Sequence, residues 1–125
     1  VSPNPDVAEV DACAEVIRQK NIGFVVALGG GSPMDCAKAA ASVALTSDSI
    51  RKYHGTGVAM PEKHLPLIAV PTTAGTGSET TLAAVITDAE TRHKYAINDF
   101  PLIPRCAVLG TYLYNATAGY GRNRN

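Results

Sequence analysis

The residues with the clearest chemical potential are Gly29-Gly30-Gly31-Ser32-Pro33, which follow a short apolar run over residues 24–28. Glycine lets the backbone adopt a positive φ and lets a bulky anion approach where a Cβ would otherwise stand. A helix that starts after such a turn presents unpaired N–H groups and a partial positive charge, which favours phosphate. Pro33 suits the first helical turn, and the Ser32 hydroxyl can cap the helix or bond a phosphate oxygen. The turn alone is equally consistent with a tight connection that binds nothing.

A second loop of similar composition supports the phosphate interpretation. Residues 72–78 read Thr-Thr-Ala-Gly-Thr-Gly-Ser and follow another apolar run, over residues 67–70. In such a loop the hydroxyls often serve only the turn's own backbone. Two such loops after neighbouring parallel strands, however, would line one crevice at the carboxyl edge of a sheet, where open α/β folds bind ligands. The spacing is neither Gly-x-Gly-x-x-Gly nor a Walker loop, because Lys38 lies well inside the next helix and is not followed by Ser or Thr.

The hydrophobic pattern predicts an α/β fold that would hold both loops. Apolar residues recur every three or four positions over 7–20, which indicates a helix, whereas the runs over 24–28 and 67–70 lack polar alternation, as strands covered on both faces do. The expected elements between and after these runs are an Ala-rich helix over 36–45, a short helix over 49–53, a hairpin pairing 82–88 with 94–97, and a strand over 106–109. The predicted fold class is therefore α/β, a short and mostly parallel sheet with flanking helices on its faces.

Composition argues against several classes of function. Eleven basic and eleven acidic side chains cancel, which gives no electrostatic reason to expect nucleic acid or an anionic membrane as a partner. The apolar runs are far too short to span a bilayer, and residues 1–6 have no signal-peptide character. Three widely spaced cysteines form no Cys-x-x-Cys pair, which predicts buried thiols in a reducing, cytoplasmic compartment. The three histidines have no metal-ligand spacing and are expected in exposed loops.

The two loops and their surroundings resemble the iron-containing (group III) alcohol dehydrogenases. Residues 29–38, Gly-Gly-Gly-Ser-Pro-Met-Asp-Cys-Ala-Lys, are similar to that family's G-G-G-S-x-x-D-x-A-K stretch. Residues 66–79 are similar to its P-x-I-A-x-P-T-T-x-G-T-G-S-E stretch, and residues 84–88, residues 3–5 and Lys94 also match. The resemblance runs over residues 1–109 and implies a partial Rossmann-like dinucleotide-binding domain there, with a divergent tail over residues 110–125.

The resemblance implies a nicotinamide dinucleotide, NAD or NADP, as the cofactor. The implied cofactor-binding residues form three groups. The first lies in residues 29–33, the glycine turn, and would bind the pyrophosphate; the second lies in residues 72–78, the threonine loop, and would bind the phosphates, ribose or nicotinamide; the third completes the cleft. They are Gly30, Gly31 and Ser32 in the first group, Thr72, Thr73 and Thr76 in the second, and Asn4, Asp35, Val85 and Lys94 in the third. Within the third group Asp35 would lie close to the nicotinamide and Lys94 would reach a ribose hydroxyl. Without the family, Lys94 would be interpreted as a solvated charge at the end of a hairpin.

The resemblance also marks where this chain departs from the family. Family members carry a further domain in which one Asp and three His bind iron or zinc, and these ligands would fall beyond Asn125, so no metal is expected in this chain. After Leu109 the family continues D-P-x-L, whereas this chain reads Gly-Thr-Tyr-Leu over residues 110–113. Nothing in the residue spacing selects a catalytic residue.

The function that the resemblance implies is that of an NAD(P)-dependent alcohol dehydrogenase or aldehyde reductase in a minimal form, acting on a small alcohol or aldehyde. Two alternatives stay open: a catalytically silent nucleotide-binding module, and an inert fragment stabilised by oligomerisation. A sheet without its outer strands exposes edges and apolar surface, so self-association into a homo-oligomer is expected.

Overall fold

The structure, a computed structural model, describes residues 5–53, 58–72, 77 and 80–109. In chain order its elements are α1 (Val7–Lys20), β1 (Val25–Gly29), α2 (Gly31–Val43), the 3-10 turn η1 (Ile50–Lys52), β2 (Leu67–Pro71), β3 (Ala83–Asp88), β4 (His93–Asn98), the 3-10 turn η2 (Phe100–Leu102) and β5 (Cys106–Ala107). The α/β class and the expected elements are confirmed, although α2 begins at Gly31 rather than at residue 36.

Helix α1 has the limits that its sequence predicts, because both ends carry a local signal. Asp6 caps the start, where its Oδ1 accepts a hydrogen bond from the Glu9 amide at 2.8 Å. Asn21 ends the helix in the left-handed conformation, with φ of 51°. Between these ends one stripe is buried, consisting of Val7, Val10, Ala14 and Ile17. The stripe lies in a core that α1 shares with α2 and with the hairpin formed by β3 and β4.

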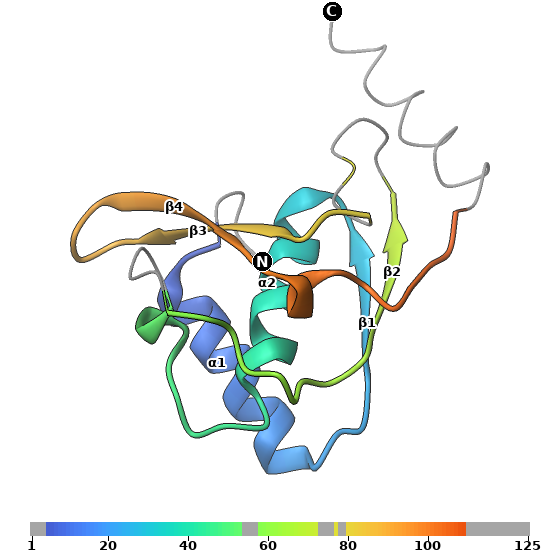
Figure 1. The fold of residues 1–125 in the computed structure, drawn as a ribbon, viewed down its shortest axis with the longest axis horizontal. Coiled ribbons are helices and arrows are strands. Elements are labelled where there is room, and N and C mark those ends of the chain that lie inside the picture. The colour runs from blue at the N-terminus through green and yellow to red at the C-terminus, as the bar shows by residue number, and fades with distance from the viewer. Residues whose placement is uncertain (1–4, 54–57, 73–76, 78–79, 110–125) are drawn as a thin grey trace, which may run out of the picture.

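The sheet is parallel and has the strand order β1-β2-β5 (Figure 1). Strands β1 and β2 pair from Val25 opposite Leu67 to Gly29 opposite Pro71, so both end at the same edge. The third strand, β5, makes a second, shorter pairing on the other side of β2. Because parallel strands share their direction, the segments that follow β1 and β2 leave the sheet together. These are the glycine turn and the threonine loop.

Helix α2 lies between the sheet and the hairpin, and both helices lie on the same side of the sheet (Figure 1). Ala27, Leu67 and Ala69 turn toward α2 and are buried with Met34 of that helix. The alternate side chains of β1, Val26 and Leu28, are 52% and 62% exposed. The expectation that this strand is covered on both faces, with helices on each, is therefore wrong for the described residues. An apolar run predicts a strand but does not say what covers each of its faces.

The hairpin of β3 and β4 is antiparallel, with Ala83 opposite Asn98 and Asp88 opposite His93, as expected. Its inner face buries Ala84 and Ile86 of β3 and Ile97 of β4 in the core shared with α1 and α2. Asp88 is also buried, and it forms an ion pair with Arg51 of η1. Such a pair compensates a carboxylate that would be costly to bury alone.

Several smaller expectations have mixed outcomes. Cys36 is buried and Cys13 half-buried, but Cys106 is exposed, so the prediction of three buried thiols is wrong for that residue. His93 begins strand β4 rather than lying in a loop, although it is exposed as expected. Among the described residues, every helix is too short or too polar to cross a lipid bilayer.

Candidate functional site

The glycine turn joins β1 to α2 through a conformation that only glycine accommodates without strain. Gly29 has φ of +147°, and a Cβ placed on it would lie 2.7 Å from Cγ of Pro33. Pro33 occupies the first turn of α2, as expected. The expected capping role of Ser32 is wrong, because the helix starts at Gly31, two residues earlier than a Ser32 cap would require, and Gly30 occupies the cap position. Ser32 is instead the second residue of α2.

The two helices of the chain differ in how their N-termini are balanced. At the start of α1, Asp6 caps the helix and Glu9 lies in the first turn, so carboxylates balance the positive end of the helix dipole. At the start of α2, Gly30 has no side chain with which to cap, and the first turn contains no acidic residue. This N-terminus therefore favours an anion supplied from outside the helix, phosphate above all.

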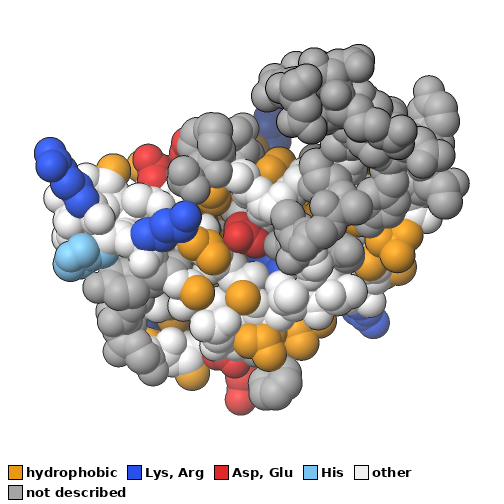
Figure 2. All heavy atoms as spheres, turned by 90° about the horizontal axis from the view of Figure 1, so that it is seen from above, with side chains coloured by type: hydrophobic (Ala, Val, Ile, Leu, Met, Phe, Trp, Pro, Cys, Tyr) orange, Lys and Arg blue, Asp and Glu red, His pale blue; other side chains and the backbone are white. Residues whose placement is uncertain are grey.

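The start of the threonine loop is hydrogen-bonded directly to the glycine turn. The Thr72 amide donates to the Gly29 carbonyl at 2.9 Å, which extends the pairing of Gly29 with Pro71 by one step. Both loops therefore emerge side by side at the carboxyl edge of the sheet, as the sequence predicts. Figure 2 views the molecule from the end toward which β1 and β2 run; the described surface that is visible there mixes hydrophobic side chains with other side chains and backbone, and charged side chains are scattered over it.

Two of the residues expected to complete the cleft are brought together by a hydrogen bond. Asp35, in the second turn of α2, accepts through Oδ2 from the Val85 amide at 3.1 Å. Lys94 of β4 pairs with Thr87 of β3, and Thr87 lies two positions along β3 from Val85. Lys94 and Val85 therefore lie on the same, outer face of the hairpin. Of the other expected residues, Gly30, Gly31, Ser32 and Thr72 lie at the carboxyl edge just described, while Asn4, Thr73 and Thr76 lie outside the described residues.

The sequence analysis missed Lys38 as a functional candidate. Its side chain is buried, and its Nζ donates to Thr81 O at 3.1 Å, Thr81 Oγ1 at 3.1 Å and Ala83 O at 3.0 Å. The available signal was its spacing: Lys38 is three residues after Asp35, so both side chains lie on the same face of α2. Both then contact the segment from Thr81 to Val85, where β3 begins.

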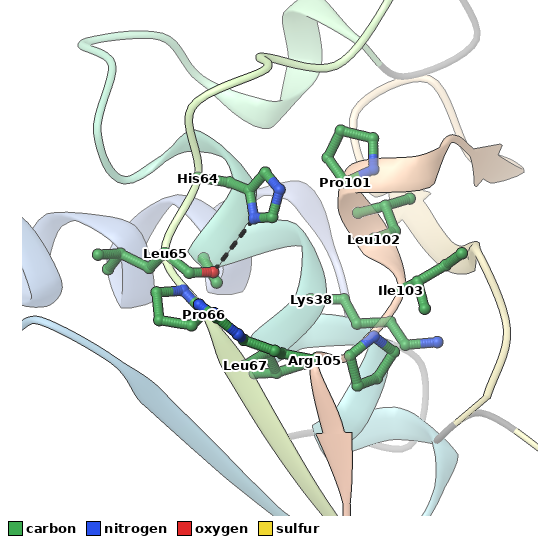
Figure 3. A pocket seen from close by; sticks show the side chains of 11 residues that line it. Lys38, His64, Leu65, Pro66, Leu67, Pro101, Leu102, Ile103 and Arg105 are labelled. Atoms are coloured by element: carbon green, nitrogen blue, oxygen red, sulfur yellow. Dashed lines mark hydrogen bonds between the residues drawn. The ribbon is translucent and has the colours of Figure 1, made fainter.

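A cleft of the described residues lies elsewhere. It holds about 400 Å³ at the amino ends of β2 and β5, between the segments over 64–67 and 101–105, and is mostly apolar. Figure 3 shows His64 on one side of it, with Nδ1 3.3 Å from Leu65 O, and the ammonium of Lys38 turned away from that side. This cleft is at the amino edge, opposite the edge where the sequence predicts phosphate binding.

Within the described part of the chain, no group of three or more His, Cys, Asp or Glu side chains is placed to hold a metal ion. Two thiols, Cys13 of α1 and Cys36 of α2, are hydrogen-bonded to each other. A hydrogen bond from Cys36 outweighs partial burial and lowers the pKa of Cys13 to about 7, while the same bond and burial raise the pKa of Cys36.

Comparison with known proteins shows which family the sequence matches. Residues 1–111 match the family model described as iron-containing alcohol dehydrogenase. Over 109 residues the chain is 44% identical to alcohol dehydrogenase 4 of Schizosaccharomyces pombe, an alignment that covers 86% of this chain and 25% of that protein. It is 38% identical over 107 residues to the NAD-dependent methanol dehydrogenase of Bacillus methanolicus, covering 86% of this chain and 28% of that one.

The fold is also that of solved relatives. The structure of sulfoacetaldehyde reductase from Bifidobacterium kashiwanohense in complex with NAD+ superposes with a TM-score of 0.88 and 59% sequence identity, covering 90% of this chain and 30% of that chain. The described α/β arrangement is therefore one found in an NAD+-bound relative. In these three comparisons the chain spans between 25% and 30% of the relative's length.

Proposed function

This chain belongs to the iron-containing alcohol dehydrogenase family, and from that premise we propose that it binds a nicotinamide dinucleotide as part of an alcohol or aldehyde oxidoreductase. NAD appears in the names of two of its relatives, the methanol dehydrogenase and the sulfoacetaldehyde reductase complex. The titration described below tests which of the two, NAD or NADP, this chain prefers.

The observation that carries the proposal is the contact between the two loops. The Thr72 amide is hydrogen-bonded to Gly29 O, and Gly29 adopts a conformation that permits the close packing of Pro33. The positive end of α2, which has no acidic first turn, faces the same edge. A diphosphate has two charged groups within a few ångströms, so it suits two adjoining loops better than either loop alone.

In this proposal each of the expected cofactor-binding residues has a binding or orienting role. Gly30, Gly31 and Ser32 hold the pyrophosphate through backbone amides and a hydroxyl, and Thr72 holds the adjoining phosphate or ribose. Asp35 lies beside the nicotinamide while one of its oxygens fixes the Val85 amide. The remaining residues proposed to complete the cofactor cleft are Thr73, Thr76, Asn4 and Lys94.

When bound, the dinucleotide supplies hydride transfer to or from a small alcohol or aldehyde. The family's metal ion would need ligands that the described residues do not bring together. We therefore assign to this chain the binding and orientation of the cofactor, and no step through a metal ion. No described residue is assigned as the proton donor.

The experiment is a titration of the full chain with NADH and with NADPH, followed by the fluorescence of the reduced nicotinamide. We expect saturable binding of at least one of them, and the comparison of the two dissociation constants gives the preference. Absence of binding by both would refute the proposal and favour an inert, oligomerising fragment.

A second step separates an enzyme from a silent binding module. Short-chain aldehydes are added to the NADH complex with and without a chelator, and oxidation is followed by absorbance. Binding without oxidation supports the silent module. Oxidation that a chelator abolishes identifies a metal requirement, and oxidation that resists the chelator identifies a metal-free route.

Two broader expectations belong to the same proposal. The exposed apolar side chains of one sheet face, Phe24, Val26, Leu28 and Val108, favour self-association, so we propose a homo-oligomer. Sedimentation velocity of the full chain tests this, and a monomer at micromolar concentration would contradict it. The free thiols of Cys13, Cys36 and Cys106 fit a reducing compartment, which supports a cytoplasmic location.

A further inference from the structure

Lys38 is the most deeply buried charged side chain among the described residues, with 1% of its surface exposed. An ammonium group carries three donors, and burying it is costly unless each donor is met. Here Nζ lies 3.0 to 3.1 Å from three oxygens, those of the Thr81 carbonyl, the Thr81 hydroxyl and the Ala83 carbonyl. These three acceptors come from one short segment of chain.

That segment is the exit of the threonine loop. Thr81 precedes β3 and Ala83 is its first residue, so Lys38 holds the point at which the loop re-enters regular structure. Asp35 strengthens the attachment by accepting from the Val85 amide. The entry of the same loop is fixed to the glycine turn by the hydrogen bond from Thr72 N to Gly29 O.

Both ends of the threonine loop are therefore attached to one continuous unit, the β1–glycine turn–α2 segment. The entry is attached by backbone pairing, which any sequence could supply. The exit is attached by two side chains of α2. Among the described hydrogen bonds, Lys38 donates three to the exit and Asp35 accepts one from it. Loss of the ammonium would leave the Thr81 and Ala83 oxygens without this donor, so the segment would no longer be held to α2 by these three bonds.

We propose that Lys38 is a positioning residue for cofactor binding: its ammonium clamps the exit of the threonine loop onto α2 and so holds the threonine loop and the glycine turn at the separation that a diphosphate requires. The proposal rests on the proposed function, because its functional readout is affinity for NADH. The clamp itself is a property of the fold and is measured separately.

The test uses three variants of the full chain. Lys38→Met keeps an unbranched side chain of similar length and removes all three donors. Thr81→Val removes one of the three acceptors and is the milder change. Ser42→Ala is the matched control, because Ser42 is also buried in α2 but donates only to the carbonyl of Lys38 within the same helix.

Hydrogen exchange and NADH titration provide the two readouts. In Lys38→Met we expect amide exchange over residues 80–85 to accelerate at least tenfold while exchange in α1 stays within twofold of the wild type. The dissociation constant for NADH should rise at least tenfold in Lys38→Met, about threefold in Thr81→Val, and less than twofold in Ser42→Ala.

Each proposal has its own refutation. If the wild-type chain binds neither NADH nor NADPH, the proposed function fails, whatever the exchange data show; if it binds only NADPH, the affinities of the variants are measured with NADPH. If the wild type binds but Lys38→Met and Ser42→Ala have the same NADH affinity, the positioning role is overturned even where residues 80–85 loosen. Should Lys38→Met not fold, Thr81→Val against Ser42→Ala decides, and equal affinities overturn the proposal.

Discussion

Substitution of Gly29 by alanine tests the geometry of the glycine turn most severely. The new Cβ would lie 2.7 Å from Cγ and 3.2 Å from Cβ of Pro33. Those atoms belong to a ring fixed to the backbone, so the contact cannot be relieved by rotating a flexible side chain. The φ of +147° is also one that alanine rarely adopts.

The expected loss of stability has two parts. An unfavourable backbone conformation costs about 1–3 kcal/mol, and overpacking of a closely packed site costs about 1–3 kcal/mol. Together they predict that Gly29→Ala lowers the free energy of unfolding by about 2–6 kcal/mol. At roughly 4 °C per kcal/mol for a domain of this size, Tm should fall by about 8–24 °C.

Gly23 provides the matched control. It precedes the same strand, but a Cβ placed on it would meet no atom within 4 Å. Gly23→Ala should therefore stabilise the chain slightly, by about 0.4–1 kcal/mol, because it restricts the unfolded state more than the folded one. The two alanine variants are predicted to change stability in opposite directions.

Thermal unfolding followed by circular dichroism measures both variants, and NADH titration at a temperature where both are folded measures the function. Gly29→Ala should bind NADH more weakly than Gly23→Ala, because movement at Gly29 also displaces the carbonyl that holds Thr72. If the two variants have equal Tm and equal affinity, the close packing of the turn is not as described and the reasoning fails.

Substitutions at three further positions probe other parts of the fold and its titrating groups. Asp6→Ala removes the cap of α1 and should lower the free energy of unfolding by about 1 kcal/mol in urea denaturation, whereas Asp6→Asn should lose less than half of that. The pKa of Cys13 is lowered to about 7 by the hydrogen bond from Cys36, so its alkylation by iodoacetamide should rise steeply between pH 6 and pH 8; in Cys36→Ala the rise should move to higher pH, and an unmoved profile would contradict the bond. Burial raises the pKa of Asp88, but the amides of residues 90 and 91 and the charge of Arg51 more than offset this effect and hold the pKa below its usual value of 3.8. The Asp88 carboxylate therefore stabilises the fold above pH 3.8, and this contribution is lost as the pH falls through the lowered pKa. Asp88→Asn should therefore flatten the acid side of the stability profile measured by urea denaturation from pH 5 to pH 2, and a profile identical to that of the wild type would exclude this contribution.

The elements predicted best from the sequence are those whose signals are local. Helix α1 has a buried stripe, a capping Asp6 and a left-handed Asn21, and each of these acts within one turn of the chain. The strands β1 and β2 and the hairpin were also predictable, because short apolar runs bounded by turn residues have few alternatives. The adjacency of the two loops followed from the parallel pairing of these strands.

What could not be predicted depends on contacts between distant parts of the chain. The pattern of β1 shows that Val26 and Leu28 are apolar, but not that both helices lie on the other face of the sheet. Ser32 was expected to cap α2, because Ser is a favoured capping residue, yet Gly30 occupies the cap position and the helix starts two residues earlier, at Gly31. Lysine is usually exposed, so the burial of Lys38 required the oxygens of a segment more than forty residues away to be in place.

The most direct test of the account is to map the site of NAD+ on the isotopically labelled chain by amide chemical-shift changes. The account predicts that saturating NAD+ shifts the amides of Gly30, Gly31, Ser32 and Thr72, at the carboxyl edge of the sheet. The chemical shifts of the amides that border the cleft at the amino edge, such as those of His64 and Ile103, should not change. Shifts confined to the amino-edge cleft, or no shifts at millimolar NAD+, would contradict the claim that the two adjoining loops bind the cofactor.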